Sequence, residues 1–138
     1  MSNPISNNMI IKCKKNTFKA IVTILLDEEK EETTYNKFWN MPDGLNKRQE
    51  YEWQEENYGC TKGICAFADY EKQEIFFETN HTPAVKIVER IAQLFSETRI
   101  EYGYDFYDHD FRYHDILDIY ENGILVDRDD TIESDEDE

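Results

Sequence analysis

The sequence has little positive charge and no long apolar run. It carries 15 Lys and Arg residues against 31 Asp and Glu residues, which gives a formal net charge of −16. A surface this acidic repels nucleic-acid phosphates and membrane head groups, and it attracts basic proteins. No run approaches the roughly 18 apolar residues that indicate a membrane-spanning helix. Direct binding to nucleic acid and insertion into a membrane are therefore both disfavoured.

The sequence also lacks the features of a secreted protein. Its three cysteines, Cys13, Cys60 and Cys65, are an odd number, which argues against the disulfide framework of a small secreted domain. Residues 1–8 do not have the charged-then-apolar layout of a secretory signal. The expected location is therefore the cytoplasm.

Zinc binding and thiol chemistry are alternatives that these residues leave open. Cys60 and Cys65 are five positions apart, and His81, His109 and His114 could supply nitrogen ligands. Structural zinc sites use a tighter cysteine pair coupled to a second pair, which this chain does not have. A cysteine nucleophile with His81 or His109 as its base requires the two side chains to meet in the fold. The expectation is free thiols and no bound metal or cofactor.

The first third of the chain is predicted to form a strand, a helix and a loop. Residues 8–12 (NMIIK) are a short apolar run typical of a strand. Asn16 is expected to cap the helix that follows. The helix is expected to fray or end within the acidic run 27–32, because carboxylates oppose the dipole at a helix C-terminus. Turn-forming residues predict a loop over 35–45. The apolar stripe of the helix is Phe18, Ile21, Val22 and Leu25.

The middle of the chain is predicted to form a hairpin and the clearest helix. Residues 64–70 and 74–79 are β-prone runs separated by a short polar turn. Thr82 is expected to cap the next helix, with Pro83 at its first position, where a missing N–H costs nothing. The stripe of this helix is Ala84, Ile87, Val88, Ile91, Leu94 and Phe95.

The last third is predicted to form a strand, a hairpin and a tail. Residues 99–104 alternate like a strand, and the Asn-Gly pair between residues 116–120 and 124–126 is a strong hairpin signal. Residues 127–138 hold eight acids and one Arg, so they are expected to be disordered.

The resulting order, β-α-β-β-α-β with a further hairpin, predicts an α+β protein. A ferredoxin-like split β-α-β sheet with both helices on one face satisfies this order. We expect residues 1–126 to form one domain that includes the C-terminal hairpin, and residues 127–138 to form an acidic tail.

Four stretches resemble a known family. They are YNKFWNMPDGL at 35–45, WQEENYGCTKGIC at 53–65, FFETNHTPAVKIVERIAQLF at 76–95 and RIEYGYDFYDHDF at 99–111. In this order they resemble the YubB-like ferredoxin-like domain family of plasmid and phage proteins, over roughly residues 5–115. The resemblance implies a ferredoxin-like fold and an origin in a mobile element, and it implies no particular activity.

The second of these stretches is similar to the family's signature Glu-Asn-Trp-Gly-Thr-Lys-Trp. Tyr58 stands for the first Trp, Cys60 interrupts Gly-Thr-Lys, and Gly63 stands for the second Trp. The matching residues are Glu56, Asn57, Gly59, Thr61 and Lys62. We interpret them structurally: a turn at the glycine, local hydrogen bonds from Asn57 and Thr61, and an ion pair of Lys62 with one of the many acids.

The densest group of functional side chains is YDFYDHDFRYHD at 104–115. Aromatic rings give contact area and carboxylates select a basic partner, so the stretch is a candidate protein-binding patch. The alternative is a metal-binding protein or small enzyme that uses the Asp/His cluster at 105–115, with His109 and His114 beside the aspartates. The predicted partner-binding residues are Tyr104, Asp105, Phe106, Tyr107, Asp108 and Asp110.

Acidic runs at 27–32, 50–56, 105–118 and 127–138 suggest a surface resembling a polyanion. Combined with the mobile-element resemblance, this charge leads to a hypothesis of protein binding without catalysis. The expected partner is a basic host protein, such as a nucleic-acid-binding defence or nuclease complex, in the host cytoplasm. The predicted role is inhibition of that enzyme, similar to an anti-CRISPR protein, with no catalytic residue and no cofactor.

Overall fold

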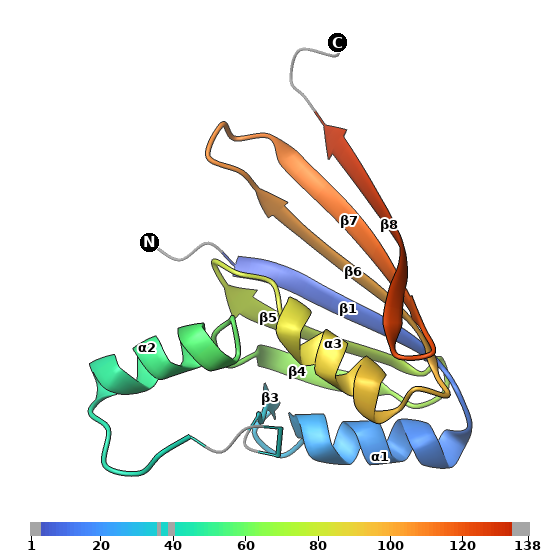
Figure 1. Cartoon of the computed structure of the whole chain (residues 1–138), viewed down its shortest axis with the longest axis horizontal. Coiled ribbons are helices and arrows are strands. Elements are labelled where there is room, and N and C mark those ends of the chain that lie inside the picture. The colour runs from blue at the N-terminus through green and yellow to red at the C-terminus, as the bar shows by residue number, and fades with distance from the viewer. Residues whose placement is uncertain (1–3, 36, 39–40, 134–138) are drawn as a thin grey trace.

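The structure is a computed structural model that describes residues 4–35, 37–38 and 41–133. Three helices and two antiparallel sheets make up this part of the chain (Figure 1). The helices are α1 (Lys15–Leu25), α2 (Lys47–Asn57) and α3 (Val85–Leu94). The strands are β1 (Pro4–Lys12), β2 (Leu26–Asp27), β3 (Glu32–Thr33), β4 (Ile64–Asp69), β5 (Glu74–Asn80), β6 (Arg99–Tyr107), β7 (Tyr113–Glu121) and β8 (Ile124–Glu133).

The large sheet has six strands in the order β4-β5-β1-β6-β7-β8, and every neighbouring pair is antiparallel. Strand β1 lies inside the sheet, with Met9 opposite Ile75 of β5 on one side and Tyr102 of β6 on the other. Strands β2 and β3 form a separate two-stranded sheet. The predicted α+β class is therefore confirmed.

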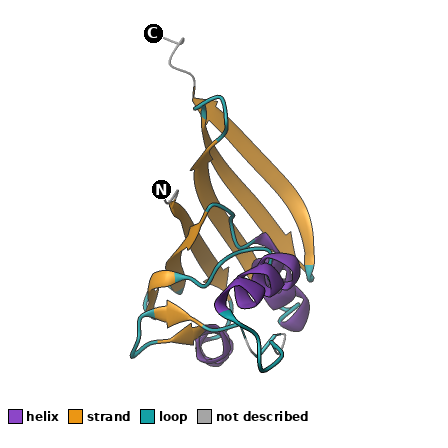
Figure 2. Ribbon diagram, turned by 90° about the vertical axis from the view of Figure 1, so that its left-hand side faces the viewer, coloured by secondary structure: helices purple, strands orange, loops and turns teal. Residues whose placement is uncertain are grey.

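The core lies between the sheet and helices α1 and α3, which pack on one face of it (Figures 1 and 2). Side chains of a strand point alternately to the two faces, and alternate residues of β1, β5 and β6 are accordingly buried. The apolar stripes of the two helices cover these residues, because each helix turns its three- and four-residue repeat toward the sheet. The buried helix residues are Phe18, Ile21, Val22, Leu25, Ile87, Val88, Ile91 and Ala92.

Asn7 is a buried polar residue that connects the sheet to α3. Its side-chain oxygen accepts hydrogen bonds from the Ala84 amide, at 3.1 Å, and from the Tyr102 hydroxyl. Its side-chain nitrogen donates to Thr79 Oγ1 at 3.1 Å. The predicted cap at Thr82 is therefore wrong: α3 begins at Val85 with no side-chain cap of its own, and Asn7 from β1 binds the amide at its start instead.

The N-terminal helix also differs from the prediction at both ends. Its N-cap is Lys14, which makes no side-chain cap bond, so the predicted cap at Asn16 is wrong. The helix ends at Leu25, before the acidic run, and residues 28–31 of that run form the turn between β2 and β3.

Helix α2 was not predicted. None of its residues is buried, so it has no apolar stripe that a periodicity argument could find. It starts with a capping box instead: the Asn46 side chain accepts from the Gln49 amide at 2.9 Å, and the Gln49 side chain accepts from the Asn46 amide at 3.0 Å. An i,i+4 ion pair between Arg48 and Glu52, at 3.1 Å, supports its first turns.

The C-terminal hairpin is confirmed. Asn122 and Gly123 have φ angles of 53° and 81°, the left-handed values that a two-residue hairpin turn requires. Strand β8 continues to Glu133 and pairs with β7 along its length, so residues 127–133 form a strand where the composition predicted disorder. Residues 134–138 of the predicted tail lie outside the described residues. None of the described helices combines the length and the apolar character needed to cross a membrane.

Candidate functional site

Strands β6, β7 and β8 extend past the helices and form an arm of the large sheet (Figures 1 and 2). The loop 108–112 lies at its tip, between β6 and β7. All six predicted partner-binding residues lie on β6 or in this loop.

The strand geometry divides these six residues between two faces. Tyr104 and Phe106 lie on the face that also carries α3, whereas Asp105 and Tyr107 lie on the opposite face, because neighbouring residues of a strand point in opposite directions. Tyr104 is 7% exposed and Tyr107 is 58% exposed. The residues predicted as one patch therefore belong to two surfaces and the loop, where Asp108 and Asp110 lie.

The helix-side face of the arm carries a row of rings that starts in the core. Tyr102 is fully buried, and its ring centroid lies 4.9 Å from that of Tyr104. Tyr104 stacks on Phe106 at 6.4 Å, and Phe106 stacks on His114 at 4.7 Å with an interplanar angle of 2°. We call these four residues the ring ladder. It continues the ring contacts of the core toward the tip of the arm.

His114 ends the ring ladder between two carboxylates. Its Nε2 lies 2.8 Å from Asp108 Oδ2, and its Nδ1 lies 3.3 Å from Asp130 Oδ1 on β8. The hydrogen bond to Asp108 is the main cause that raises the pKa of His114. The same bond, helped by the Arg112 and Asp110 backbone amides, lowers the pKa of Asp108 to about 2. The imidazole therefore connects the tip loop, β7 and β8.

A second ion pair on the same face joins β7 to β8. Asp118 is completely buried and accepts two hydrogen bonds from Arg128, at 2.7 and 2.9 Å. These bonds raise the pKa of Arg128. Because a buried carboxylate without a partner is costly, the pair holds β8 in register with β7.

The opposite face of the arm carries four carboxylates: Asp105, Asp115, Asp127 and Asp129. Asp105 lies directly opposite Asp115, and Asp127 and Asp129 lie opposite Ile119 and Leu117 of β7. We call these four aspartates the carboxylate face. Among the residues that the structure describes, no Lys, Arg or His forms an ion pair with any of them.

The four charges occupy three rows along the arm. Asp105 and Asp115 share one row, and Asp129 and Asp127 lie two and four residue steps further along, which is about 7 and 14 Å. Like charges on opposed strands destabilise a sheet, so a cation bound beside the Asp105–Asp115 pair would relieve this repulsion.

Sequence reasoning placed Asp105 in the site and treated the acids of β8 as parts of a disordered tail. The alternation of residues 127–131 along a strand would have placed Asp127 and Asp129 on one face. That signal was hidden because composition alone suggested disorder.

The described residues give little support to the two alternatives, a metal site and a cysteine nucleophile. The described residues contain no group of three or more His, Cys, Asp and Glu side chains placed to hold a metal ion. His109 is exposed in the tip loop, apart from the carboxylates that bind His114. Cys60 is buried, where desolvation raises its pKa to about 12, and its thiol donates to the Tyr35 hydroxyl at 3.7 Å. A thiol held in this protonated form is a poor nucleophile.

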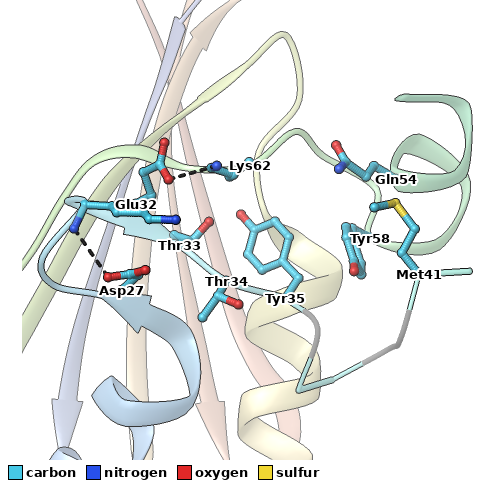
Figure 3. Close-up of a pocket in the computed structure, with 10 residues that line it drawn as sticks. Asp27, Glu32, Thr33, Thr34, Tyr35, Met41, Gln54, Tyr58 and Lys62 are labelled. Carbon is cyan, nitrogen blue, oxygen red and sulfur yellow. Dashed lines mark hydrogen bonds and ion pairs between the residues drawn. The ribbon is translucent and has the colours of Figure 1, made fainter. Parts of the chain in front are cut away.

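The stretch 56–62 plays a structural role at the margin of a pocket (Figure 3). Lys62 pairs with Glu32 at 2.8 Å, which confirms the predicted ion pair. Thr61 Oγ1 accepts from the Asn80 amide at 2.9 Å, and Asn57 donates to the Trp53 carbonyl at 2.9 Å.

The pocket has a volume of about 300 Å³. Figure 3 shows the ring of Tyr35 in it, with the Lys62–Glu32 pair alongside. Its lining contains charges of both signs, so it favours neither an anion nor a cation. The lining residues are Asp27, Lys30, Glu32, Thr33, Thr34, Tyr35, Met41, Gln54, Tyr58 and Lys62.

Comparisons of the chain with family models, with curated proteins and with solved structures found no significant match.

Proposed function

We propose that this chain is a protein-binding domain that inhibits a nucleic-acid enzyme of a host cell by presenting a surface resembling a polyanion. The observation that carries the proposal is the carboxylate face: four aspartates on one side of a projecting arm, none paired with a cation among the described residues. Such a surface attracts a basic channel at long range and speeds its association.

The fold supports an assignment to the ferredoxin-like class. The strands β4-β5-β1-β6 are antiparallel neighbours, with α1 between β1 and β4 along the chain and α3 between β5 and β6. This arrangement agrees with a split β-α-β sheet, to which β7 and β8 add an arm. The resemblance to the YubB-like family supports a plasmid or phage origin, and hence action in the host cytoplasm.

The proposed partner is a basic host protein such as a CRISPR effector nuclease. The chain contributes charge and shape, and the proposal assigns it no catalytic step and no cofactor. Its net charge of −16 disfavours direct contact with DNA or RNA.

The test is displacement of a labelled DNA duplex from purified CRISPR effector nucleases, one from each effector type, with the chain as competitor. Replacing the carboxylate face (Asp105→Asn, Asp115→Asn, Asp127→Asn and Asp129→Asn) is expected to weaken competition by about tenfold or more, since each exposed ion pair contributes up to about 1 kcal/mol. The effect is expected to diminish at high salt.

The matched control removes four exposed carboxylates elsewhere: Glu29→Gln, Glu56→Gln, Glu71→Gln and Glu97→Gln. Both variants carry a formal net charge of −12, which is −16 plus four. The control is expected to compete nearly as well as the unaltered chain. If both variants lose competition equally, the carboxylate face acts only through the net charge of the chain. If the chain displaces DNA from none of the effectors, the proposed function is wrong.

A further inference from the structure

The large sheet has two edge strands, β4 and β8, and among the described residues only β4 has backbone hydrogen bonds on its outer side. The backbone of β4 is covered by the segment around β3. The Ala66 amide donates to the Glu31 carbonyl at 2.8 Å, and the Thr33 amide donates to the Gly63 carbonyl at 3.0 Å. At the other edge, no described residue forms a backbone hydrogen bond with the outer side of β8. Because alternate amides and carbonyls of an edge strand point outward, β8 offers unused donors and acceptors.

Strand β8 is long, and it begins with three exposed apolar residues. It contains ten residues. Ile124, Leu125 and Val126 are 63%, 40% and 48% exposed. Consecutive exposed apolar residues are unfavourable in a folded chain unless they serve binding.

The same strand has no proline and no lysine, and its one arginine is held by Asp118. Five of its ten residues are charged, and its ladder with β7 has a register shift between Ile119 and Tyr120, and both features protect an edge against pairing with another copy of the chain. A second copy of the chain is a poor occupant, because pairing two β8 strands brings their aspartates together, and like charges opposed across strands are destabilising. The charge of β8 thus disfavours self-association and favours a basic segment.

We propose that the partner adds an extended segment with alternating basic residues to the open edge of β8, as a seventh strand of the sheet. This inference rests on the proposed function and specifies how the carboxylate face is used. Backbone hydrogen bonds to β8 give affinity, and the side chains that alternate along the added strand give specificity.

The strand register shows how the aspartates and the exposed apolar residues of β8 can both contact the added strand. Asp127 and Asp129 lie on the carboxylate face, two residues apart. An added strand lies about 4.8 Å from β8, and its own alternate residues lie about 6.8 Å apart, matching these two aspartates. Lysines or arginines at those positions meet the carboxylates, while apolar residues at the other end of the segment cover Ile124 to Val126.

The experiment compares two decapeptides with the same composition, both with blocked ends. One alternates lysine and valine, and the other has its five lysines in one block and its five valines in another. The alternating peptide is expected to bind the full chain at least about tenfold more tightly. On its binding, amide hydrogen exchange measured by NMR is expected to slow in β8 and to remain unchanged in β4.

Three outcomes overturn the inference. The first is equal binding of the two peptides without slower exchange in β8, which leaves the proposed function standing as a purely electrostatic attraction. The second is displacement of DNA from an effector by the chain while neither peptide binds. The third is a concentration-dependent dimer, detected by sedimentation, whose formation slows exchange in β8, because the occupant is then a second copy. A complete lack of DNA displacement contradicts the proposed function itself, and the displacement assay detects it independently of the peptide experiment.

Discussion

Nε2 of His114 lies 2.8 Å from Oδ2 of Asp108, and this contact connects the tip loop of the arm to β7. Asp130 reaches the other ring nitrogen from β8, and Phe106 stacks against the ring from β6. The imidazole can bond both carboxylates as a donor only when it is protonated. The stability that these contacts give to the arm is therefore expected to depend on pH.

The raised pKa of His114 predicts a loss of stability as the pH rises above about 6.5. Its unfolded pKa is about 6.5, and its folded pKa is higher. The stabilisation is thus fully present below about pH 6.5 and is lost as the pH rises through the folded value. In NMR titrations, His114 is expected to lose its proton above pH 6.5. The free energy of unfolding is expected to decline over the same range.

The variant His114→Gln is expected to remove this pH dependence. The matched control is His109→Gln, which changes the exposed histidine of the tip loop and is expected to leave the decline intact. An equal decline in the His114 variant would show that the contact contributes nothing to stability. At the acidic end, the pKa of Asp108 is lowered to about 2. Its contribution is therefore present above about pH 4 and lost as the pH falls toward 2.

Removing the buried side-chain amide of Asn7 is expected to lower the stability of the protein strongly. In Asn7→Ala, the Tyr102 hydroxyl and the Ala84 amide lose their acceptor. Each buried group left without a partner costs about 1–3 kcal/mol, so the free energy of unfolding is expected to fall by about 2–6 kcal/mol. Urea unfolding measures this change.

The matched control is Asn8→Ala, one position along the same strand and on the opposite face of the sheet. It is expected to change stability by about 0.5 kcal/mol or less. Equal effects at the two positions would mean that the Asn7 network adds nothing beyond an ordinary strand residue.

The parts of the fold that could be predicted are those in which a local sequence pattern determines the structure. Strands β4, β5 and β6, helix α3 and the hairpin at Asn122-Gly123 all follow local signals of alternation, apolar stripe or turn chemistry. The structure contains each of them. The α+β class followed from their order.

The unpredicted parts depend on contacts between distant residues or on side chains that carry no apolar pattern. The amide at the start of α3 is bound by Asn7, which is 77 positions away in the sequence. Helix α2 depends on a capping box and buries no residue. Strand β8 is acidic enough to suggest disorder, yet the Asp118–Arg128 pair and the β7 ladder order it. The site was predicted as one patch because alternation was not applied to 104–110.

Gly63 lies in a tightly packed position after the stretch 56–62. A Cβ atom at this position would lie 2.6 Å from both the Phe77 ring and the Thr33 methyl group. The Gly63 amide also donates to Thr33 Oγ1 at 2.7 Å, so the backbone cannot move away without losing that bond. A side chain as large as Trp therefore has no room at position 63.

The variant Gly63→Ala is expected to lower the free energy of unfolding by about 1–3 kcal/mol through overpacking, measured by urea unfolding. Gly44→Ala is the matched control. Gly44 has a positive φ of 83°, and a Cβ atom added to it would meet no other atom within 4 Å, so the substitution brings backbone strain without a clash. That strain is expected to cost about 1 kcal/mol.

A double variant separates the two contacts that crowd position 63. Adding Thr33→Ser to Gly63→Ala removes the Thr33 methyl group, which is one of the two crowding groups, and keeps the hydroxyl that accepts from the backbone amide of residue 63. Because the added Cβ then meets only the Phe77 ring at close range, part of the lost stability is expected to return. No recovery in this double variant would indicate that the Phe77 contact alone excludes a side chain at position 63.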